Sequence, residues 1–338
     1  MTDAPSSSRT ALVIGATGSF GAHAAMALKK HGWRIRALAR DPAAAAAKCG
    51  AHTPIEWVKG DAMNRADVAA AAAGAQVIVH GANPPGYRNW RGLAMPMLEA
   101  TIAAAKASGA RIVLPGNVYN YAPDAGPHIG ETAPQAPATR KGRIRVEMEA
   151  RLREAAREGV KTLVLRAGDF FGPAAPTSSL SWLTVSSRGR ITRVYAPGPV
   201  GVGHAFAYLP DLAETLARLL DREAGLADFD TFHFAGHWLA RGDEFAGAIR
   251  RATGNAKLPL TPFPWPLIIA LSPFNETLRE LLETRYLWRR PIGLDDAKLR
   301  AFLGTVPATP LDAAMRATLA DMGALETAPT GAGRLATA

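Results

Sequence analysis

The sequence has almost no cysteine and no recognisable metal-binding motif. Cys49 is the one cysteine among 338 residues, so the chain cannot form an internal disulfide. It contains neither a CxxC pair nor an HExxH motif, and its histidines form no cluster in the sequence. Structural and catalytic metal sites therefore lack a visible set of ligands. A reducing compartment such as the cytoplasm is the expected location.

Long apolar runs are also missing. Residues 266–271 form an apolar segment that is much shorter than the roughly 20 residues needed to cross a bilayer. Residues 1–10 contain an acid and no apolar stretch. We therefore expect neither a secretory signal nor a membrane anchor.

Acidic residues are fewer than basic ones. Lysine and arginine together number 39 against 29 acids, which gives a formal net charge of +10. This balance favours anionic ligands and would tolerate nucleic acid. However, the basic residues are scattered along helical segments such as 143–159, where acids alternate with them. No RNP-like stretch and no interleaved basic and aromatic patch occurs, so a nucleic-acid partner is disfavoured.

What is present at the N-terminus is a glycine-rich motif. Residues 10–21 read TALVIGATGSFG, a short apolar strand followed by three glycines at GxxGxxG spacing and then by a helical pattern. Gly15 permits a tight turn, Gly18 allows the backbone to approach a pyrophosphate, and Gly21 permits close packing of helix on strand. The helix start then offers N–H groups to phosphate. The motif predicts a dinucleotide site.

Strand and helix patterns alternate up to about residue 170. Apolar strands are predicted at 11–14, 34–39, 55–58, 77–80, 111–114 and 161–166. Helices are predicted at 20–31, 64–73, 90–108 and 143–158. Continuous apolar strands alternating with helices indicate a parallel sheet covered on both faces. The fold class is therefore α/β, a Rossmann-type doubly wound parallel sheet.

After Gly172 the composition changes. Residues 173–203 are rich in Gly, Pro and Ser and predict a loop and hairpin. We expect a nucleotide-binding domain over 1–172 to which 204–235 return, a smaller, mainly helical substrate lobe made of 173–203 and 236–325, and a flexible tail over 326–338. Aromatic side chains of the lobe offer walls for a small-molecule substrate. A homodimer is compatible with this organisation.

Several landmarks resemble the extended short-chain dehydrogenase/reductase family, the group containing nucleotide-sugar epimerases, dehydratases and 3β-hydroxysteroid dehydrogenases. They stand in family order along the chain: GATGSFG at 15–21, KGDAMN at 59–64, NVYNYAP at 117–123, RAGDFFGP at 166–173, HAFAYLPDLAE at 204–214 and KLRAFLGTVPATPLDAAM at 298–315. The resemblance implies a nicotinamide cofactor across the strand ends and a substrate under the C-terminal lobe.

The resemblance also implies which residues hold the cofactor. The turn residues would wrap the pyrophosphate, Asp61 and Ala62 would lie near the adenine, and a loop after the fourth strand would pass under the cofactor. The implied set is Gly15, Thr17, Gly18, Ser19, Phe20, Gly21, Asp61, Ala62, Gly81, Ala82 and Asn83.

The second strand bears on the choice between NADP and NAD. An NAD enzyme usually ends this strand with an acid that binds the ribose hydroxyls, whereas a 2′-phosphate needs a cation nearby. Here the strand ends at Ala39 and Arg40, and Arg40 can clamp a phosphate. Asp41 would cap the next helix. The sequence favours NADP, and NAD and a plain surface role for Arg40 stay open.

The chemistry is where the sequence departs from the family. Hydride-transferring members use a YxxxK pair on one helix face, and no YxxxK occurs in this chain. Counting back from Glu147 places Arg143 at the lysine position and Thr139 at the tyrosine position. The Ser or Thr expected four residues before Tyr119 is replaced by Pro115.

Other residues could supply the missing chemistry. Asn117 could polarise a substrate oxygen or fix the turn, and Tyr119 could donate a proton or be a core ring. Asp169 follows a strand end and could act in the site or cap a turn. Arg143 could hold the nicotinamide ribose or lower the pKa of a nearby tyrosine.

These alternatives leave three functional classes. The first is an NAD(P)-dependent oxidoreductase or epimerase/dehydratase-like enzyme that acts on a small carbonyl or hydroxyl substrate. The second is a dinucleotide-binding, NmrA-like redox sensor or regulator without turnover. The third is an RNA-binding atypical family member.

Overall fold

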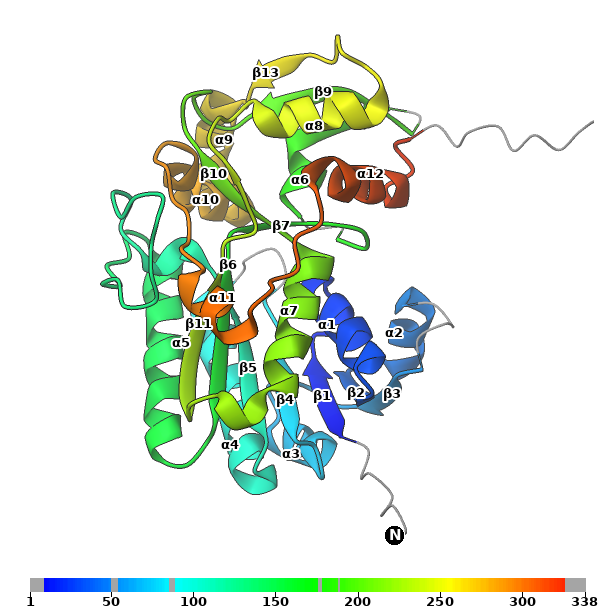
Figure 1. Ribbon diagram of the computed structural model, residues 1–338, viewed down its shortest axis with the longest axis vertical. Helices are drawn as coiled ribbons and strands as arrows, with labels where there is room; N and C mark the ends of the chain where they lie inside the picture. The colour runs from blue at the N-terminus through cyan, green and yellow to red at the C-terminus, as the bar shows by residue number, and fades with distance from the viewer. Residues whose placement is uncertain (1–8, 50–53, 85–88, 176–177, 188, 326–338) are drawn as a thin grey trace, which may run out of the picture.

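The computed structural model describes residues 9–49, 54–84, 89–175, 178–187 and 189–325, and its centre is a seven-stranded parallel sheet (Figure 1). The strands are ordered β11-β6-β5-β4-β1-β2-β3. Their bounds are β1 Thr10–Ile14, β2 Arg34–Ala39, β3 Glu56–Lys59, β4 Val77–His80, β5 Arg111–Gly116, β6 Thr162–Ala167 and β11 Phe229–Phe234. This arrangement confirms the predicted Rossmann-type sheet.

Helices cover both faces of the sheet because the apolar strands present buried side chains on both. Ala11 and Val13 face a core that includes residues of α1 and α7, whereas Leu12 and Ile14 face a core that includes residues of α3, α4 and α5. The helices are α1 Ser19–Lys30, α2 Pro42–Cys49, α3 Arg65–Ala72, α4 Trp90–Ser108, α5 Arg140–Arg157 and α7 Leu209–Asp221.

Helix α2 was absent from the sequence prediction. Its alanines lack an apolar pattern of helical period, and Ala45 is its one buried residue among those described. Asp41 explains where it begins, since its Oδ1 accepts a hydrogen bond of 3.0 Å from the Ala44 N–H. The predicted capping role of Asp41 is therefore confirmed.

A second lobe lies beyond the carboxyl ends of the central strands (Figure 1). It contains two three-stranded sheets, ordered β12-β10-β7 and β13-β9-β8, and β8 and β9 form the predicted hairpin. The strands are β7 Asp169–Phe171, β8 Thr184–Ser187, β9 Arg190–Ala196, β10 His204–Tyr208, β12 His237–Leu239 and β13 Leu260–Pro262. The helices are α6 Ser179–Leu183, α8 Glu244–Thr253, α9 Trp265–Leu271, α10 Glu276–Glu283 and α12 Leu311–Asp321.

The segment 204–235, predicted to return to the nucleotide-binding domain, is divided between the two lobes. Strand β11 joins the edge of the central sheet and α7 packs on α1, whereas β10 pairs with β7 and β12. Helix α11 Ala297–Leu303 lies against β11 (Figure 1). Short 3₁₀ turns complete the chain: η2 Val118–Asn120, η3 Glu223–Gly225, η4 Ser272–Phe274 and η5 Arg285–Trp288. The predicted tail 326–338 lies outside the described residues.

Candidate functional site

The turn between β1 and α1 is packed too closely for side chains. Gly15 has a φ of +85°, and a Cβ there would lie 2.7 Å from the Gly81 carbonyl carbon. A Cβ on Gly21 would lie 2.2 Å from the Gly15 oxygen. The turn, the start of α1 and the end of β4 therefore meet through glycine backbone. These contacts place the turn at the point between β1 and β4 where the strand order reverses.

Gly18 differs from Gly15 and Gly21, the other two glycines of the motif, because it faces open space. It is exposed, and a Cβ there would meet only the Gly15 oxygen at 3.3 Å. Helix α1 begins immediately after Gly18 without a side-chain cap and without an acid in its first turn. Its N-terminus therefore presents the positive end of the helix dipole with no opposing carboxylate. The described residues fit the pyrophosphate of a dinucleotide.

Two further features lie beside this turn. The Thr17 carbonyl accepts a hydrogen bond of 3.1 Å from the Lys48 Nζ, which brings a cation to the turn. Phe20 is buried at the start of α1 and stacks on Phe170, with ring centroids 6.2 Å apart. Ser19 is half-buried in the first turn. The strand-end segment after β6 thus lies against the glycine-rich turn.

A shallow pocket lies at the ends of β2 and β3. Its described lining consists of Arg40, Lys59, Gly60, Asp61 and Asp67. Arg40 and Lys59 are both exposed, and β2 pairs Ala39 with Lys59, so two cations flank one end of the pocket. Asp61 accepts a bond of 2.9 Å from the Met63 N–H and donates its own N–H to Asp67.

The loop after β4 begins at a buried histidine. The His80 Nδ1 donates to the Thr101 hydroxyl at 2.8 Å, since that hydroxyl donates its own hydrogen to the Met97 carbonyl. The His80 Nε2 has no hydrogen-bond partner among the described residues. Burial, with the charge of Arg145 adding to it, lowers the pKa of His80 to about 4, so the ring is neutral at pH 7. Gly81 and Ala82 follow half-buried, and Asn83 is exposed.

In the sequence analysis, Glu147 was used to align α5 with the family's YxxxK motif. The structure shows that Glu147 does not lie on the buried face of this helix. Thr139 caps the helix by accepting the Gly142 N–H at 3.0 Å, and both Arg143 and Glu147 are exposed. The buried acid is instead Glu149, two residues later. Counting back four residues from it reaches Arg145 rather than Arg143.

The contacts of Arg145 support this register. Its guanidinium donates to the Pro115 carbonyl at 3.3 Å, at the end of β5, and lies 5.0 Å from the Trp90 ring centroid. Gly142 is the feature of the sequence that could have identified Arg145. A Cβ on Gly142 would lie 2.3 Å from the Tyr119 carbonyl oxygen, so this glycine marks the face of α5 that touches the strand-end turn.

The corrected register places Lys141 at the family's tyrosine position. Lys141 is buried, donates to the Glu280 carbonyl oxygen at 2.5 Å and lies 3.4 Å from a carboxylate oxygen of the same residue. Burial lowers the pKa of Lys141, and the charge of Glu280 opposes that shift. An ion pair therefore joins α5 to α10 at this position.

Asn117 and Tyr119, which we considered for catalysis, both make structural contacts in the turn after β5. The Asn117 Oδ1 accepts a bond of 3.0 Å from the Tyr119 N–H, and the Asn117 carbonyl accepts one of 2.6 Å from Arg166. Asn117 thus fixes the turn with its side-chain oxygen, whereas polarising a substrate oxygen would call for its amide N–H groups. Tyr119 is half-buried and packs against the core of the second lobe.

Asp169 lies in a cluster of polar and aromatic side chains. The sequence analysis proposed only Asp169 of this cluster as a catalytic candidate. Its Oδ2 is 2.9 Å from the Nε2 of His204, and the other ring nitrogen of His204 donates to the Leu287 carbonyl at 3.2 Å. The His204 ring stacks on Trp288, with centroids 3.8 Å apart and planes at 9°. The buried Tyr286 hydroxyl has no partner among the described residues, and burial, helped by the charges of Asp169 and Glu283, raises the pKa of Tyr286.

These contacts require a shared proton. A carbonyl oxygen only accepts, so the Nδ1 of His204 carries a hydrogen. Asp169 and Nε2 can then bond only through a second proton, held either on the imidazole or on the carboxyl group. The pair therefore shares one proton through the bond between the Nε2 of His204 and Asp169. Sequence reasoning identified Asp169 and missed His204, because the two stand 35 residues apart.

The described ranges contain neither a metal-holding cluster nor a membrane-spanning helix. Within them no group of three or more His, Cys, Asp or Glu residues is placed to hold a metal ion. Among the helices of these same ranges, none combines the length and the apolar character that crossing a bilayer requires.

Comparison with protein families gives one match that spans most of the chain. The model of the NAD dependent epimerase/dehydratase family matches residues 11–232. This match confirms the resemblance drawn from the landmarks. None of the curated proteins matches the sequence significantly.

Solved structures share the fold at low sequence identity. A candidate epimerase from Burkholderia cenocepacia J2315 superposes with a TM-score of 0.73 at 20% identity, over 94% of this chain and 98% of that one. UDP-glucuronic acid 4-epimerase from Bacillus cereus, solved with UDP-glucuronic acid and NAD, gives 0.72 at 13%, over 93% and 98%. UDP-glucose-4-epimerase from Stenotrophomonas maltophila, solved with NAD and formylated UDP-arabinopyranose, gives 0.72 at 17%, over 93% and 98%.

Proposed function

The chain belongs to the NAD dependent epimerase/dehydratase family, and on that basis we propose that it is an NAD(P)-dependent oxidoreductase or epimerase-like enzyme acting on a carbonyl or hydroxyl group. The observation that carries the proposal is the uncapped start of α1 beside the open face of Gly18. The pyrophosphate would bind there, and the glycine contacts of Gly15, Gly21 and Gly81 hold the surrounding backbone. The NAD in the two sugar-nucleotide epimerase structures supports the same cofactor class.

The cofactor would bring the hydride chemistry, and the chain would bring the proton. In the proposed mechanism the Asp169–His204 pair gives a proton to the substrate oxygen during reduction and takes it back during oxidation. Arg145 would hold the ribose next to the nicotinamide, at the place of the family's lysine. Neutral His80 would accept a hydrogen bond through Nε2 without adding charge. This assignment replaces Arg143 and Asn117, and leaves Tyr119 as a wall of the site.

A binding measurement tests the cofactor assignment. Gly18→Val places side-chain atoms where the phosphates approach, whereas the Gly18 φ of −91° is accessible to any residue. NADPH affinity measured by fluorescence titration should fall at least about 100-fold, because phosphate and helix N-terminus can no longer meet. Gly201→Val is the matched control, since Gly201 is also exposed and a Cβ there meets nothing within 4 Å. Equal affinity in both variants would remove the pyrophosphate from this turn.

Selectivity between the cofactors tests the pocket at β2 and β3. We propose that Arg40 and Lys59 bind the 2′-phosphate of NADP. Arg40→Ala should weaken NADPH binding about tenfold or more and NADH binding little, because only NADPH loses a charge-assisted pair. The matched control is Arg65→Ala, which removes an exposed arginine on α3. Equal losses for NADPH and NADH in Arg40→Ala would leave Arg40 as an ordinary surface residue.

Turnover distinguishes an enzyme from a sensor. Purified protein should oxidise NADPH, followed by its absorbance, with at least one carbonyl compound or nucleotide sugar in a substrate panel. Tight NADPH binding with no turnover on every compound would favour the NmrA-like regulator. Absence of NADPH and NADH binding would contradict both.

A further inference from the structure

The surface of the second lobe carries a cluster of exposed apolar side chains on α9 and on the η4 turn that follows it. Leu267, Ile269, Leu271 and Phe274 are 56%, 47%, 45% and 88% exposed, and they are four of the eight large apolar side chains exposed in the described ranges. Residues 258–275 contain no charged residue. A helix that is apolar on all sides is normally buried, so this cluster, the α9–η4 patch, marks an interaction surface.

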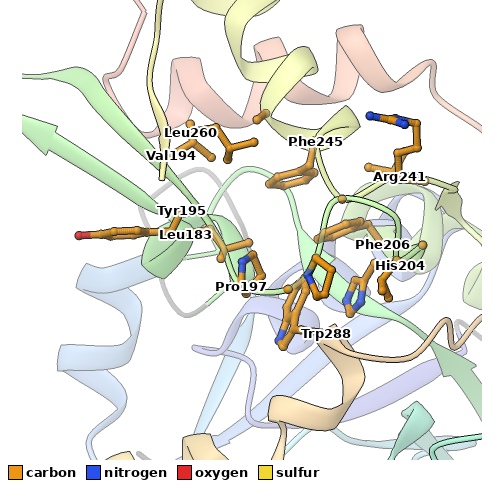
Figure 2. A pocket seen from close by; sticks show the side chains of 17 residues that line it. Leu183, Val194, Tyr195, Pro197, His204, Phe206, Arg241, Phe245, Leu260 and Trp288 are labelled. Carbon is orange, nitrogen blue, oxygen red and sulfur yellow. The ribbon is translucent and has the colours of Figure 1, made fainter. Parts of the chain in front are cut away.

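The inner side of the same segment is firmly packed. Trp265 is buried and its Nε1 donates to the Pro197 carbonyl at 2.7 Å, while Ile268 packs against the core of the lobe. Pro197 also lines a pocket with Phe206 and Trp288 (Figure 2). The volume of that pocket is about 30 Å³, which is room for a water molecule and not for a leucine side chain. The patch therefore cannot withdraw into this pocket.

The charges of the neighbouring helix α10 are divided between two sides. Helix α10 lies next to α9 (Figure 1), and its exposed Arg279 donates to the Pro273 carbonyl of η4 at 3.0 Å. The acids of α10 point to the nucleotide-binding domain instead. Glu276 accepts the N–H of the residue before α4, and Glu280 and Glu283 accept from the first residue of α5. The edge of the patch is therefore cationic, in a protein of formal net charge +10.

We propose that the α9–η4 patch binds an anionic lipid surface, with its four apolar side chains below the headgroups and Arg279 beside the lipid phosphates. Apolar side chains that are flanked by basic residues are the combination that holds proteins reversibly on such surfaces. A protein interface of standard size uses about 20–30 residues on each side, far more than this patch offers. The contact is peripheral, needs no spanning helix and is independent of the proposed reaction.

Co-sedimentation of the purified protein with lipid vesicles tests the proposal. The protein should bind vesicles of phosphatidylcholine mixed with phosphatidylglycerol about tenfold or more tightly than vesicles of phosphatidylcholine alone, because the edge of the patch is cationic. Leu267→Glu should weaken binding to the mixed vesicles about tenfold or more, since it places a carboxylate against anionic lipid. Met26→Glu is the matched control, because Met26 on α1 is 57% exposed and the variant has the same net charge. It should bind nearly as the parent does.

Three results would overturn the proposal. The first is a parent protein that stays in the supernatant with the mixed vesicles. The second is an equal loss in Leu267→Glu and Met26→Glu, which would reduce the effect to net charge. The third is a parent dimer, measured by light scattering, that Leu267→Glu dissociates, because a second copy of the chain would then cover the patch. Phe274→Glu repeats each comparison if Leu267→Glu does not fold, as judged by circular dichroism.

Discussion

Asp169→Asn should lower turnover by about 10²-fold or more, the usual scale for removing a positioned proton donor. Asn has the shape of Asp, and its amide N–H can donate a hydrogen to the Nε2 of a neutral His204 ring. It cannot share the additional proton that the two acceptors around the imidazole require. NADPH affinity should stay close to that of the parent, because Asp169 lies outside the turn proposed to hold the phosphates. Steady-state rates with the best carbonyl substrate of the panel measure the effect.

A matched control separates the loss of a proton donor from a general effect of removing a carboxylate. Asp124→Asn is the matched control, since Asp124 is exposed in the loop after β5. A rate for Asp169→Asn within a few-fold of the control would show that another group moves the proton.

Glu149→Ala should cost about 3–5 kcal/mol of folding free energy, the usual result of removing one partner from a buried ion pair. The side chains of Arg166 and Glu149 are 0% and 3% exposed, and they form two hydrogen bonds of 2.8 and 2.7 Å. Asn120 and Gln135 donate to the same carboxylate. Its removal leaves a fully buried guanidinium without its anion. Urea denaturation followed by circular dichroism gives the change in unfolding free energy.

The control for this change lies on the same helix. The Glu154 side chain is 60% exposed and approaches Arg151 at 3.4 Å, so Glu154→Ala should cost less than about 1 kcal/mol. The double variant Glu149→Leu with Arg166→Met removes both charges and should recover most of the stability. Similar losses for Glu149→Ala and Glu154→Ala would mean that the buried pair does not hold α5 against β6.

The same network connects the turn after β5 to distant segments of the central sheet, because its partners lie on α5, β6 and β11. Arg166 reaches the Asn117 carbonyl as well as Glu149, and the Tyr121 hydroxyl lies 3.0 Å from the Nε2 of His233. Burial lowers the pKa of His233 to about 3, with the charge of Arg166 adding to the effect. The ring is therefore neutral at pH 7 and can accept from its neighbours. None of these partners adjoins another in the sequence.

Local pattern was sufficient for the nucleotide-binding half. Apolar strands that alternate with helices can bury both faces only in a covered parallel sheet, and the predicted strands at 34–39 and 77–80 coincide with β2 and β4. The glycine spacing likewise predicted the turn, because the close contact of Gly21 is with the backbone of Gly15, which is near in sequence, although Gly15 itself packs on Gly81 of a distant strand end. The family landmarks named the same fold.

The register of α5 required the tertiary structure. Glu147 and Glu149 stand two residues apart, so they point to opposite sides of the helix, and the sequence letters fit the family's acid equally well. Only the burial of Arg166 opposite Glu149 selects one of them. That selection moves the cation from Arg143 to Arg145 and places Lys141 where the phenol would be.

The sequence by itself determined the fold, the glycine-rich turn and the absence of YxxxK, because each depends on residues that are neighbours along the chain. Only the tertiary structure decided which groups surround Asp169. Asp169, His204 and Leu287 meet across separations of 35 and 83 residues. Such contacts follow from the packing of segments that are distant along the chain, which no local spacing encodes.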